Sequence, residues 1–245
     1  MLMCLKINNG AIFIADAHED ENNEDFYNFL KQIDSKKIQA SQLFLMGDMF
    51  DLLVGKVNYG VSKYKKYIEL IEKISCSIEV IYYEGNHDFS LSTLFKNVKV
   101  IPIENQPTKA LLEDGTVVYL SHGDKYGDLI HKIYTKLIRS NGVLKVLNMI
   151  DMMTNNTISK NIENAQLKKH LCKKIENFED IISAKLFHYK ALKNSYILEG
   201  HYHQNYKFKR NDINYINLPS FACKQSYFIV ECSYDEKFAL RGCNV

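Results

Sequence analysis

Five short polar clusters, each directly after an apolar segment, constrain the fold of this chain most strongly. They are Asp16-Ala17-His18, Gly47 to Asp51, Gly85 to Asp88, His122-Gly123-Asp124 and Gly200 to His203. The apolar segments before them, 11–15, 43–46, 78–83, 116–120 and 196–198, have the composition of buried strands. In open α/β sheets, ligands bind at the carboxyl ends of strands. The pattern therefore predicts an α/β fold in which the clusters lie at the ends of its strands.

The residue types in the clusters predict a site for two divalent metal ions. Such a site needs carboxylate and amide oxygens, neutral imidazoles and one carboxylate that bridges the ions. Asp16 and His18 are two residues apart after a strand, so their side chains point the same way and converge on one ion. Two cations roughly 4 Å apart lower the pKa of a water molecule and neutralise phosphoryl oxygens. Phosphoester hydrolysis without a protein nucleophile is the chemistry that this site predicts.

Secondary-structure patterns add helices and hairpins to this outline. Helices are predicted over 22–33 and 61–75, which gives βαβ units around a buried sheet. Three hairpins are predicted, from 109–112 with 116–120, 206–209 with 213–217, and 227–232 with 238–241. The chain therefore combines parallel βαβ units with antiparallel hairpins.

Taken in order, the motifs D-x-H, G-D-x-x-D, G-N-H-D, H-G-D and G-H-x-H resemble the calcineurin-like metallophosphoesterase superfamily, from Asp16 to His203. The resemblance implies a four-layer αββα sandwich of two mixed sheets with a helical cap insertion. We expect a single domain over residues 1–245, with the cap at about 125–195. With 46% hydrophobic residues, the 245-residue chain is long enough to bury one sizeable core.

The same resemblance implies a role for each polar residue. One ion would be held by Asp16, His18, Asp48 and His203, and the other by Asp48, Asn86, His122 and His201, so that Asp48 bridges the two. A set of nitrogen and oxygen ligands suits Mn²⁺, Fe²⁺, Mg²⁺ or catalytic Zn²⁺, and the resemblance favours Mn²⁺.

Four further residues are expected to act on the substrate, orient the ligands or cap turns. By the resemblance, His87 is a catalytic residue that faces the substrate phosphate with Asn86, and it stabilises the phosphate or protonates the leaving group. Asp51 is expected to hydrogen-bond His87 and fix its tautomer; the alternative is a carboxylate in the first turn of a helix. Asp88 and Asp124 either cap turns or orient neighbouring ligands.

A narrower resemblance concerns the substrate. Gly47 to Gly55, Ser121 to Asp124 and the helical insertion before Gly200 resemble the UDP-2,3-diacylglucosamine hydrolases of lipid A biosynthesis. Those enzymes cleave a pyrophosphate to release UMP and 2,3-diacylglucosamine 1-phosphate at the inner membrane surface. This chain has His87 where many of them carry Arg. A cytosolic phosphoesterase acting on nucleotides or phosphoproteins is the alternative, and a non-catalytic binding module is disfavoured because every expected ligand is present.

The insertion combines apolar residues at helical spacing with a group of lysines. The apolar residues are Ile130, Ile133, Tyr134, Leu137, Ile138, Leu144, Leu147, Met149, Ile150, Met152, Met153, Ile181, Ile182, Leu186 and Tyr189. They either pack on each other and on the sandwich or line a groove for acyl chains. Lys168, Lys169, Lys173 and Lys174 either face solvent or contact anionic lipid headgroups.

Charge and cysteine content bear on partners and compartment. The net charge of +2 gives no electrostatic reason to expect nucleic acid as a partner. The sequence shows no secretory signal and no apolar stretch of membrane-spanning length, so a cytoplasmic protein is expected. By the narrower resemblance it would make peripheral contact with the cytoplasmic face of the inner membrane. The six cysteines, at 4, 76, 172, 223, 232 and 243, have no paired spacing and are expected to be reduced thiols.

Overall fold

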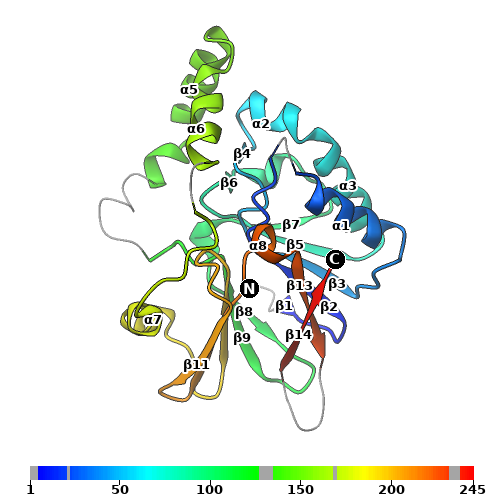
Figure 1. Ribbon diagram of the computed structural model, residues 1–245, viewed down its shortest axis with the longest axis vertical. Helices are drawn as coiled ribbons and strands as arrows, with labels where there is room; N and C mark the ends of the chain where they lie inside the picture. The colour runs from blue at the N-terminus through cyan, green and yellow to red at the C-terminus, as the bar shows by residue number, and fades with distance from the viewer. Residues whose placement is uncertain (1–4, 21–22, 127–134, 168–169, 232–237) are drawn as a thin grey trace.

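Two six-stranded mixed sheets pack face to face in the computed structural model, which describes residues 5–20, 23–126, 135–167, 170–231 and 238–245 (Figure 1). The first sheet has the order β1 (Leu5–Lys6), β8 (Thr108–Leu111), β9 (Val117–Ser121), β10 (Tyr196–Glu199), β12 (Ile213–Asn217) and β11 (Tyr206–Arg210). The second has the order β14 (Ala239–Asn244), β13 (Ser226–Glu231), β2 (Ala11–Ile14), β3 (Gln42–Leu45), β5 (Glu79–Tyr83) and β7 (Lys99–Ile101). Strands β4 (Leu53–Val54) and β6 (Asp88–Phe89) form a small parallel pair.

Helices follow the strands along the chain. They are α1 (Asp25–Asp34), α2 (Asn58–Lys63), α3 (Lys65–Ser75), α5 (Asn141–Met153), α6 (Thr157–Gln166), α7 (Phe178–Leu186) and α8 (Phe221–Lys224), with 3-10 turns at Leu91–Thr93, Ile103–Asn105 and Phe187–Tyr189. The helix predicted over 61–75 is two helices, which meet at Tyr64. The three predicted hairpins are present, since β8 pairs with β9, β11 with β12 and β13 with β14, all antiparallel.

Three layers of buried side chains hold the architecture together. Between the sheets, the rings of Phe13 and Phe44 stack with centroids 4.3 Å apart. On the outer face of the second sheet, Phe29 of α1 and Ile71 of α3 are fully buried. On the outer face of the first sheet, Ile182 of α7 packs in a cluster with strand residues of β10 and β12. The order of layers is helix, sheet, sheet, helix, so the predicted αββα fold is confirmed.

The segment that we expected to be a cap divides into two parts. Helix α7 belongs to the outer layer of the sandwich, whereas α5 and α6 extend beyond it next to α2 (Figure 1). Burial of the apolar residues does not follow this division: Leu144 of α5 and Ile182 of α7 are buried, whereas Met149 and Met153 of α5 are exposed. Ile130, Ile133 and Tyr134 lie outside the described residues. In the part of the chain that is described, none of the helices has the length and apolar character needed to cross a membrane.

The expectation of reduced cysteines is wrong for one pair. Cys172 and Cys223 form a disulfide, with their Cα atoms 5.8 Å apart, although 51 positions separate them in the sequence. No local spacing announces such a pair, because the chain brings the segment after α6 back beside α8 only in three dimensions. Cys76 and Cys243 are free thiols, and Cys4 and Cys232 lie outside the described residues.

Candidate metal centre

The first two polar clusters lie side by side because β2 and β3 pair in parallel and their pairing continues beyond the strand ends. The backbone N–H of Asp16 donates to the carbonyl of Gly47, and that of His18 donates to the carbonyl of Asp48, both at 3.1 Å. Gly47 has a φ of +91°, and a Cβ atom there would collide with the His122 ring. Only glycine therefore fits at the turn that brings the second cluster against the fourth.

Most of the predicted ligands have a backbone conformation that side chains rarely adopt. Five of the seven have a positive φ, between 45° and 61°: Asp16, His18, Asp48, His201 and His203. Each such residue costs on the order of 1 kcal/mol or more, and such strain gathers at functional sites. The surrounding sheet holds these five residues in the strained conformation, and their side chains point toward one another.

The predicted ligands form a single cluster. Ligand atoms of Asp16, His18 and His203 lie within 4.8 Å of one another, and those of Asp48, His122 and His201 do so as well. Asn86 joins them, since its Oδ1 lies 3.4 Å from Nε2 of His122. The structure thus brings all seven predicted ligands together, in the two groups that the resemblance implies; their roles as ligands stay predictions.

Asp48 belongs to the second group, and its backbone carbonyl accepts from the N–H of His18 in the first. Its Oδ2 is 3.3 Å from Nε2 of His122 and 4.0 Å from Nε2 of His87. A Cβ atom on Gly85 would collide with the Asp48 carboxylate, so a glycine is needed there for close approach. Asp48 thus contacts residues of both groups, and its role as the bridging carboxylate stays a prediction.

The imidazoles are oriented as metal-ligating histidines usually are. Nδ1 of His122 donates to the carbonyl of Met46 at 2.9 Å, and Nδ1 of His203 donates to the carbonyl of Leu171 at 2.7 Å. Nδ1 of His18 lies 3.1 Å from the Asp51 carboxylate. Oxygen partners on the far nitrogen fix the tautomer and leave Nε2 for the metal.

The surroundings of the Nε2 atoms show whether metal ions fit the site. Nε2 of His18 is buried and has no hydrogen-bond partner among the described residues, and Nε2 of His203 is buried with only Oδ1 of Asp16, another predicted ligand, 3.1 Å away. A buried polar atom without a partner is costly. Coordination of a divalent ion would satisfy both nitrogens, and the mixture of imidazole, carboxylate and amide donors is one that such ions accept. The residues therefore fit a dinuclear centre.

Charge in the cluster is strongly coupled. Burial alone would raise the pKa of Asp48, but the imidazoles of His122 and His87 hold it well below its usual range. Burial alone would lower the pKa of His122, but Asp48 raises it well above its usual range. Burial and the neighbouring His122 keep the pKa of His201 well below its usual range, so this imidazole is neutral, as a ligand must be.

The structure corrects the expected contact of Asp51. Its carboxylate meets His18, and its backbone carbonyl, at 3.0 Å, is what accepts a hydrogen bond from Nδ1 of His87. Asp51 is not in a helix either, because the next helix, α2, begins at Asn58. The spacing of the motif did not show that the chain turns after Asp48, which places the side chain and the carbonyl of Asp51 on different imidazoles.

Asp88 proves to be an organiser of two loops. Its Oδ1 accepts from the backbone N–H groups of Asp48 and Gly85, both at 2.9 Å. Its Oδ2 accepts from the N–H of Met49 at 2.7 Å and from the hydroxyl of Tyr82 at 2.6 Å. Of the two alternatives left open for Asp88, orientation of a neighbouring ligand is the one observed. The Asp124 carboxylate is buried, and its oxygens have no hydrogen-bond partner in the described ranges.

Two cavities meet at this cluster. The first, of about 630 Å³, is lined by His18, Asp48, Asn86, His87, His170, Leu171, Lys173, Lys174, Ile175, Glu176, His201, Tyr202 and His203. The second, of about 380 Å³, shares Asn86, His87 and His201 with the first and extends between β4, β6 and the helices α5 and α6. The sequence predicted Lys173 and Lys174 to face solvent or to contact lipid headgroups; both are exposed, in agreement with the first alternative, and they also line the first cavity, which we call the polar cavity. Lys168 and Lys169 lie outside the described residues.

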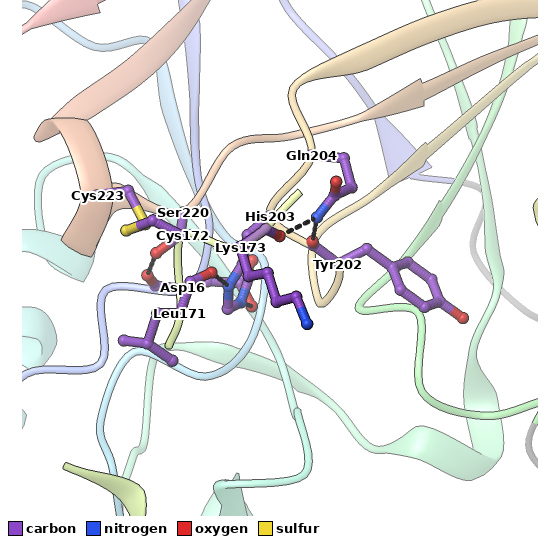
Figure 2. The surroundings of a disulfide bond; sticks show 9 residues. All are labelled: Asp16, Leu171, Cys172, Lys173, Tyr202, His203, Gln204, Ser220 and Cys223. Atoms are coloured by element: carbon purple, nitrogen blue, oxygen red, sulfur yellow. Dashed lines mark hydrogen bonds and ion pairs between the residues drawn. A yellow bond between two sulfur atoms is a disulfide. The ribbon is translucent and has the colours of Figure 1, made fainter. Parts of the chain in front are cut away.

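The disulfide anchors the segment that lines the first cavity, since Leu171 and Lys173, on either side of Cys172, are lining residues. Figure 2 shows Cys172 and Cys223 next to Asp16, His203 and Leu171. On the other side of the bond, the hydroxyl of Ser220 donates to the carbonyl of Asp16 at 2.7 Å (Figure 2). The covalent link therefore joins the segment that positions His203 to the segment that holds Asp16.

Comparison with known proteins agrees with this geometry. A family model for calcineurin-like phosphoesterases matches residues 11–217. The chain belongs to the calcineurin-like phosphoesterase family. The resemblance inferred from the five motifs is thereby confirmed, and metal-dependent phosphoester hydrolysis is the chemistry of this family.

Several curated relatives of this phosphoesterase share one description. A UDP-2,3-diacylglucosamine hydrolase of Histophilus somni is 26% identical over 133 residues, which cover 53% of this chain and 56% of the relative. The chain thus spans about half the length of that relative. A UDP-2,3-diacylglucosamine hydrolase of Proteus mirabilis is 20% identical over 197 residues, covering 79% of this chain and 82% of the relative.

Two solved phosphoesterase structures align with most of the chain. An archaeal phosphodiesterase matches with a TM-score of 0.48 and 10% identity, covering 96% of this chain and 99% of that one. A phosphoesterase from E. coli matches with a TM-score of 0.45 and 14% identity, covering 94% and 97%.

Proposed function

We propose that this phosphoesterase hydrolyses the pyrophosphate of UDP-2,3-diacylglucosamine to UMP and 2,3-diacylglucosamine 1-phosphate, a step of lipid A biosynthesis. The observation that carries the proposal is the second cavity. Its walls are largely apolar, with Val54, Phe89, Leu144, Leu147 and Ile162 among the lining residues, and it opens on His87 beside the metal centre. An apolar cavity that ends at a phosphoester-cleaving site suits a substrate in which an acyl chain is close to a phosphate.

The polar cavity suits the other half of such a substrate. Lys173 and Lys174 line it together with Tyr202, on the same side of the centre as His203. Ammonium groups attract phosphate oxygens, and an aromatic ring offers a face on which a nucleobase can stack. The two cavities together would hold an amphiphilic pyrophosphate with its scissile bond at their junction.

The predicted ligands supply the chemistry in this proposal. Asp16, His18, Asp48 and His203 would hold one divalent ion, and Asp48, Asn86, His122 and His201 the other. When bound, the ions lower the pKa of the attacking water and neutralise phosphoryl charge. Mn²⁺ is the proposed metal.

His87 is the proposed catalytic residue of the protein itself. Its Nδ1 is held by the carbonyl of Asp51, and the ring lines both cavities where they meet. A proton on Nε2 can be donated to the oxygen of the departing phosphate as the P–O bond breaks and water supplies the new oxygen. Asn86, next to it, would contact the same phosphate.

Contact with a membrane surface is part of the proposal. The far end of α5 exposes Met149, Met152 and Met153, which are 56%, 53% and 79% exposed. Flexible thioether side chains of this kind insert readily among irregular apolar partners. We therefore place the protein at the cytoplasmic face of the inner membrane, where such a lipid substrate would be met.

The proposal is tested by comparing a lipid substrate with a soluble one. Release of UMP from UDP-2,3-diacylglucosamine in detergent micelles is measured beside hydrolysis of bis(p-nitrophenyl) phosphate. Leu147→Asp, in the wall of the apolar cavity, is expected to raise KM for the lipid about 10-fold, because it places a charge where an acyl chain would lie. It should leave the soluble diester unaffected.

Met153→Asp is the matched control, since Met153 lies on the same helix and does not line that cavity. It is expected to behave as wild type in detergent. Turnover of soluble diesters together with no release of UMP from the lipid would reject the proposal in favour of a phosphoesterase for nucleotides or phosphoproteins.

A further inference from the structure

Arg139 crosses from the insertion into the loop that carries Asn86. Its Nη2 donates to the carbonyl of Gly85 at 2.6 Å, and its Nη1 donates to Oε2 of Glu84 at 3.1 Å. The guanidinium also lies over the Phe89 ring, 4.6 Å from the centroid. The side chains of Arg139 and Glu84 are 8% and 4% exposed, so this ion pair is shielded from water. Arg139 is thus a built contact and not a solvated surface charge.

The residues that Arg139 contacts come immediately before two predicted site residues. Gly85 precedes Asn86 and His87, and its own N–H is held by Asp88 at 2.9 Å. The peptide groups on both sides of Gly85 are therefore fixed, one by Asp88 and the other by Arg139. Since a few ångströms of backbone separate the Gly85 carbonyl from the Asn86 side chain, the direction of that amide depends on both bonds.

Hydrogen bonds of Gln106 connect the same loop to His122. Nε2 of Gln106 donates to the carbonyl of Glu84 at 2.8 Å, and Oε1 of Gln106 accepts from the backbone N–H of His122 at 2.7 Å. Glu84 thus lies between Arg139 and the loop of His122. The side chains of Asn86 and His122, both predicted ligands, lie 3.4 Å from one another.

We infer that Arg139 is a positioning residue: it fixes the Gly85 carbonyl and so sets Asn86 for one of the two metal ions. Its effect on turnover rests on the proposed function, whereas its effect on metal binding does not. Loss of a contact that orients a ligand typically lowers metal affinity 10- to 100-fold.

Another contact of the insertion provides a matched control. Glu163 of α6 accepts from Lys63 Nζ and from the Tyr59 hydroxyl, both at 2.8 Å, and so ties the insertion to α2. None of the hydrogen bonds recorded for Glu163 in the described residues involves a predicted ligand. Glu163→Gln weakens the docking of the insertion without changing the environment of Gly85.

The experiment titrates metal-free protein with Mn²⁺ in a calorimeter. For Arg139→Met we expect two sites, one with wild-type affinity and one weakened at least about 10-fold. Arg139→Lys, which keeps the charge and one donor, should lie between Arg139→Met and wild type. Glu163→Gln should bind both ions as wild type does. With the soluble diester, the Arg139→Met variant should have a lowered kcat at limiting Mn²⁺. Its kcat should return to the wild-type value when the Mn²⁺ concentration is raised.

The double variant Glu84→Gln/Arg139→Met separates positioning from simple charge balance. Removing Arg139 alone leaves a buried carboxylate without its cation, which by itself is destabilising. The double variant removes that cost but still leaves the Gly85 carbonyl without its donor. Positioning predicts that the weak Mn²⁺ site persists in the double variant, while thermal stability returns.

Three results would overturn the inference. They are wild-type affinity for both ions in Arg139→Met, full recovery of affinity in the double variant, and an equal loss in Glu163→Gln. A failure of the proposed function would look different, since wild-type protein would then release no UMP from the lipid although Arg139→Met still weakened one Mn²⁺ site.

Discussion

Nδ1 of His18 lies 3.1 Å from Oδ1 of Asp51, and both side chains are buried. The carboxylate holds one nitrogen of the imidazole, so the other, which has no partner among the described residues, remains for a metal ion. Carboxylate support of this kind raises the basicity of a ligating histidine and fixes its ring. Asp51 therefore acts on the ion that Asp16, His18 and His203 would share, and not only on the substrate.

Substitution of Asp51 is accordingly expected to change metal binding. Asp51→Ala should weaken one of two Mn²⁺ ions by about 10- to 100-fold, because the His18 ring loses its orienting acceptor. Asp51→Asn keeps an oxygen at this position and should lose less. Calorimetric titration of the metal-free variants measures both. Unchanged Mn²⁺ affinity together with slower turnover would instead show that the Asp51 side chain supports His87 in catalysis.

Asp48 is expected to matter to both ions. It is the predicted bridge between the two ions, so Asp48→Ala should leave the protein with neither ion and with nearly all activity lost. Metal content after gel filtration, measured by mass spectrometry, tests this. His87→Ala is the comparison, because it should lower turnover while both ions are retained. Retention of one full equivalent of metal by Asp48→Ala would show that this aspartate does not bridge.

Much of the centre could be predicted because its ligands follow strands. A strand ends at a definite residue, and parallel pairing carries Asp16 and Asp48 to the same edge of a sheet. Side chains at such an edge converge whatever the rest of the fold does. The family resemblance supplied the set of seven predicted ligands, and the packing of the two sheets brings together motifs that follow strands of both.

Contacts that depend on loops or on the insertion could not be predicted in the same way. The Asp51 carboxylate meets His18 because of a turn that no periodicity reveals, and Arg139 meets Gly85 across 54 positions of sequence. The same holds for Cys172 and Cys223, whose pairing follows from where the segment after α6 runs. The local sequence pattern determines where a strand begins and ends, whereas these contacts depend on how segments distant in the sequence pack against one another.

The disulfide is expected to stabilise the protein. A bond that closes a loop of this length contributes about 2 to 4 kcal/mol, mainly by restricting the unfolded chain. Cys172→Ser/Cys223→Ser should lower the free energy of unfolding in urea by that amount. Cys76→Ser, at an exposed free thiol, is the control and should change it by less than about 0.5 kcal/mol. If dithiothreitol leaves the unfolding curve of wild type unchanged, the bond contributes nothing.

Glu19 is expected to make stability depend on pH. Its carboxylate is buried, accepting from the Tyr67 hydroxyl at 2.7 Å and from the N–H of Phe26 at 3.1 Å. Burial raises the pKa of Glu19 from 4.5 to about 7, an effect that these hydrogen bonds reduce but do not cancel. Between those pH values the folded protein binds more protons than the unfolded chain, so stability falls as pH rises through this window.

The size of this effect follows from the shift in pKa. Between pH 5 and pH 8, metal-free wild type should lose about 2 to 3 kcal/mol of unfolding free energy relative to Glu19→Gln, which cannot ionise at this position. Urea unfolding of both proteins at the two pH values measures the difference. Glu69→Gln, at an exposed position of α3, is the control and should track wild type. Parallel pH profiles for wild type and Glu19→Gln would mean that Glu19 is already ionised at pH 5 in the folded protein, despite its burial.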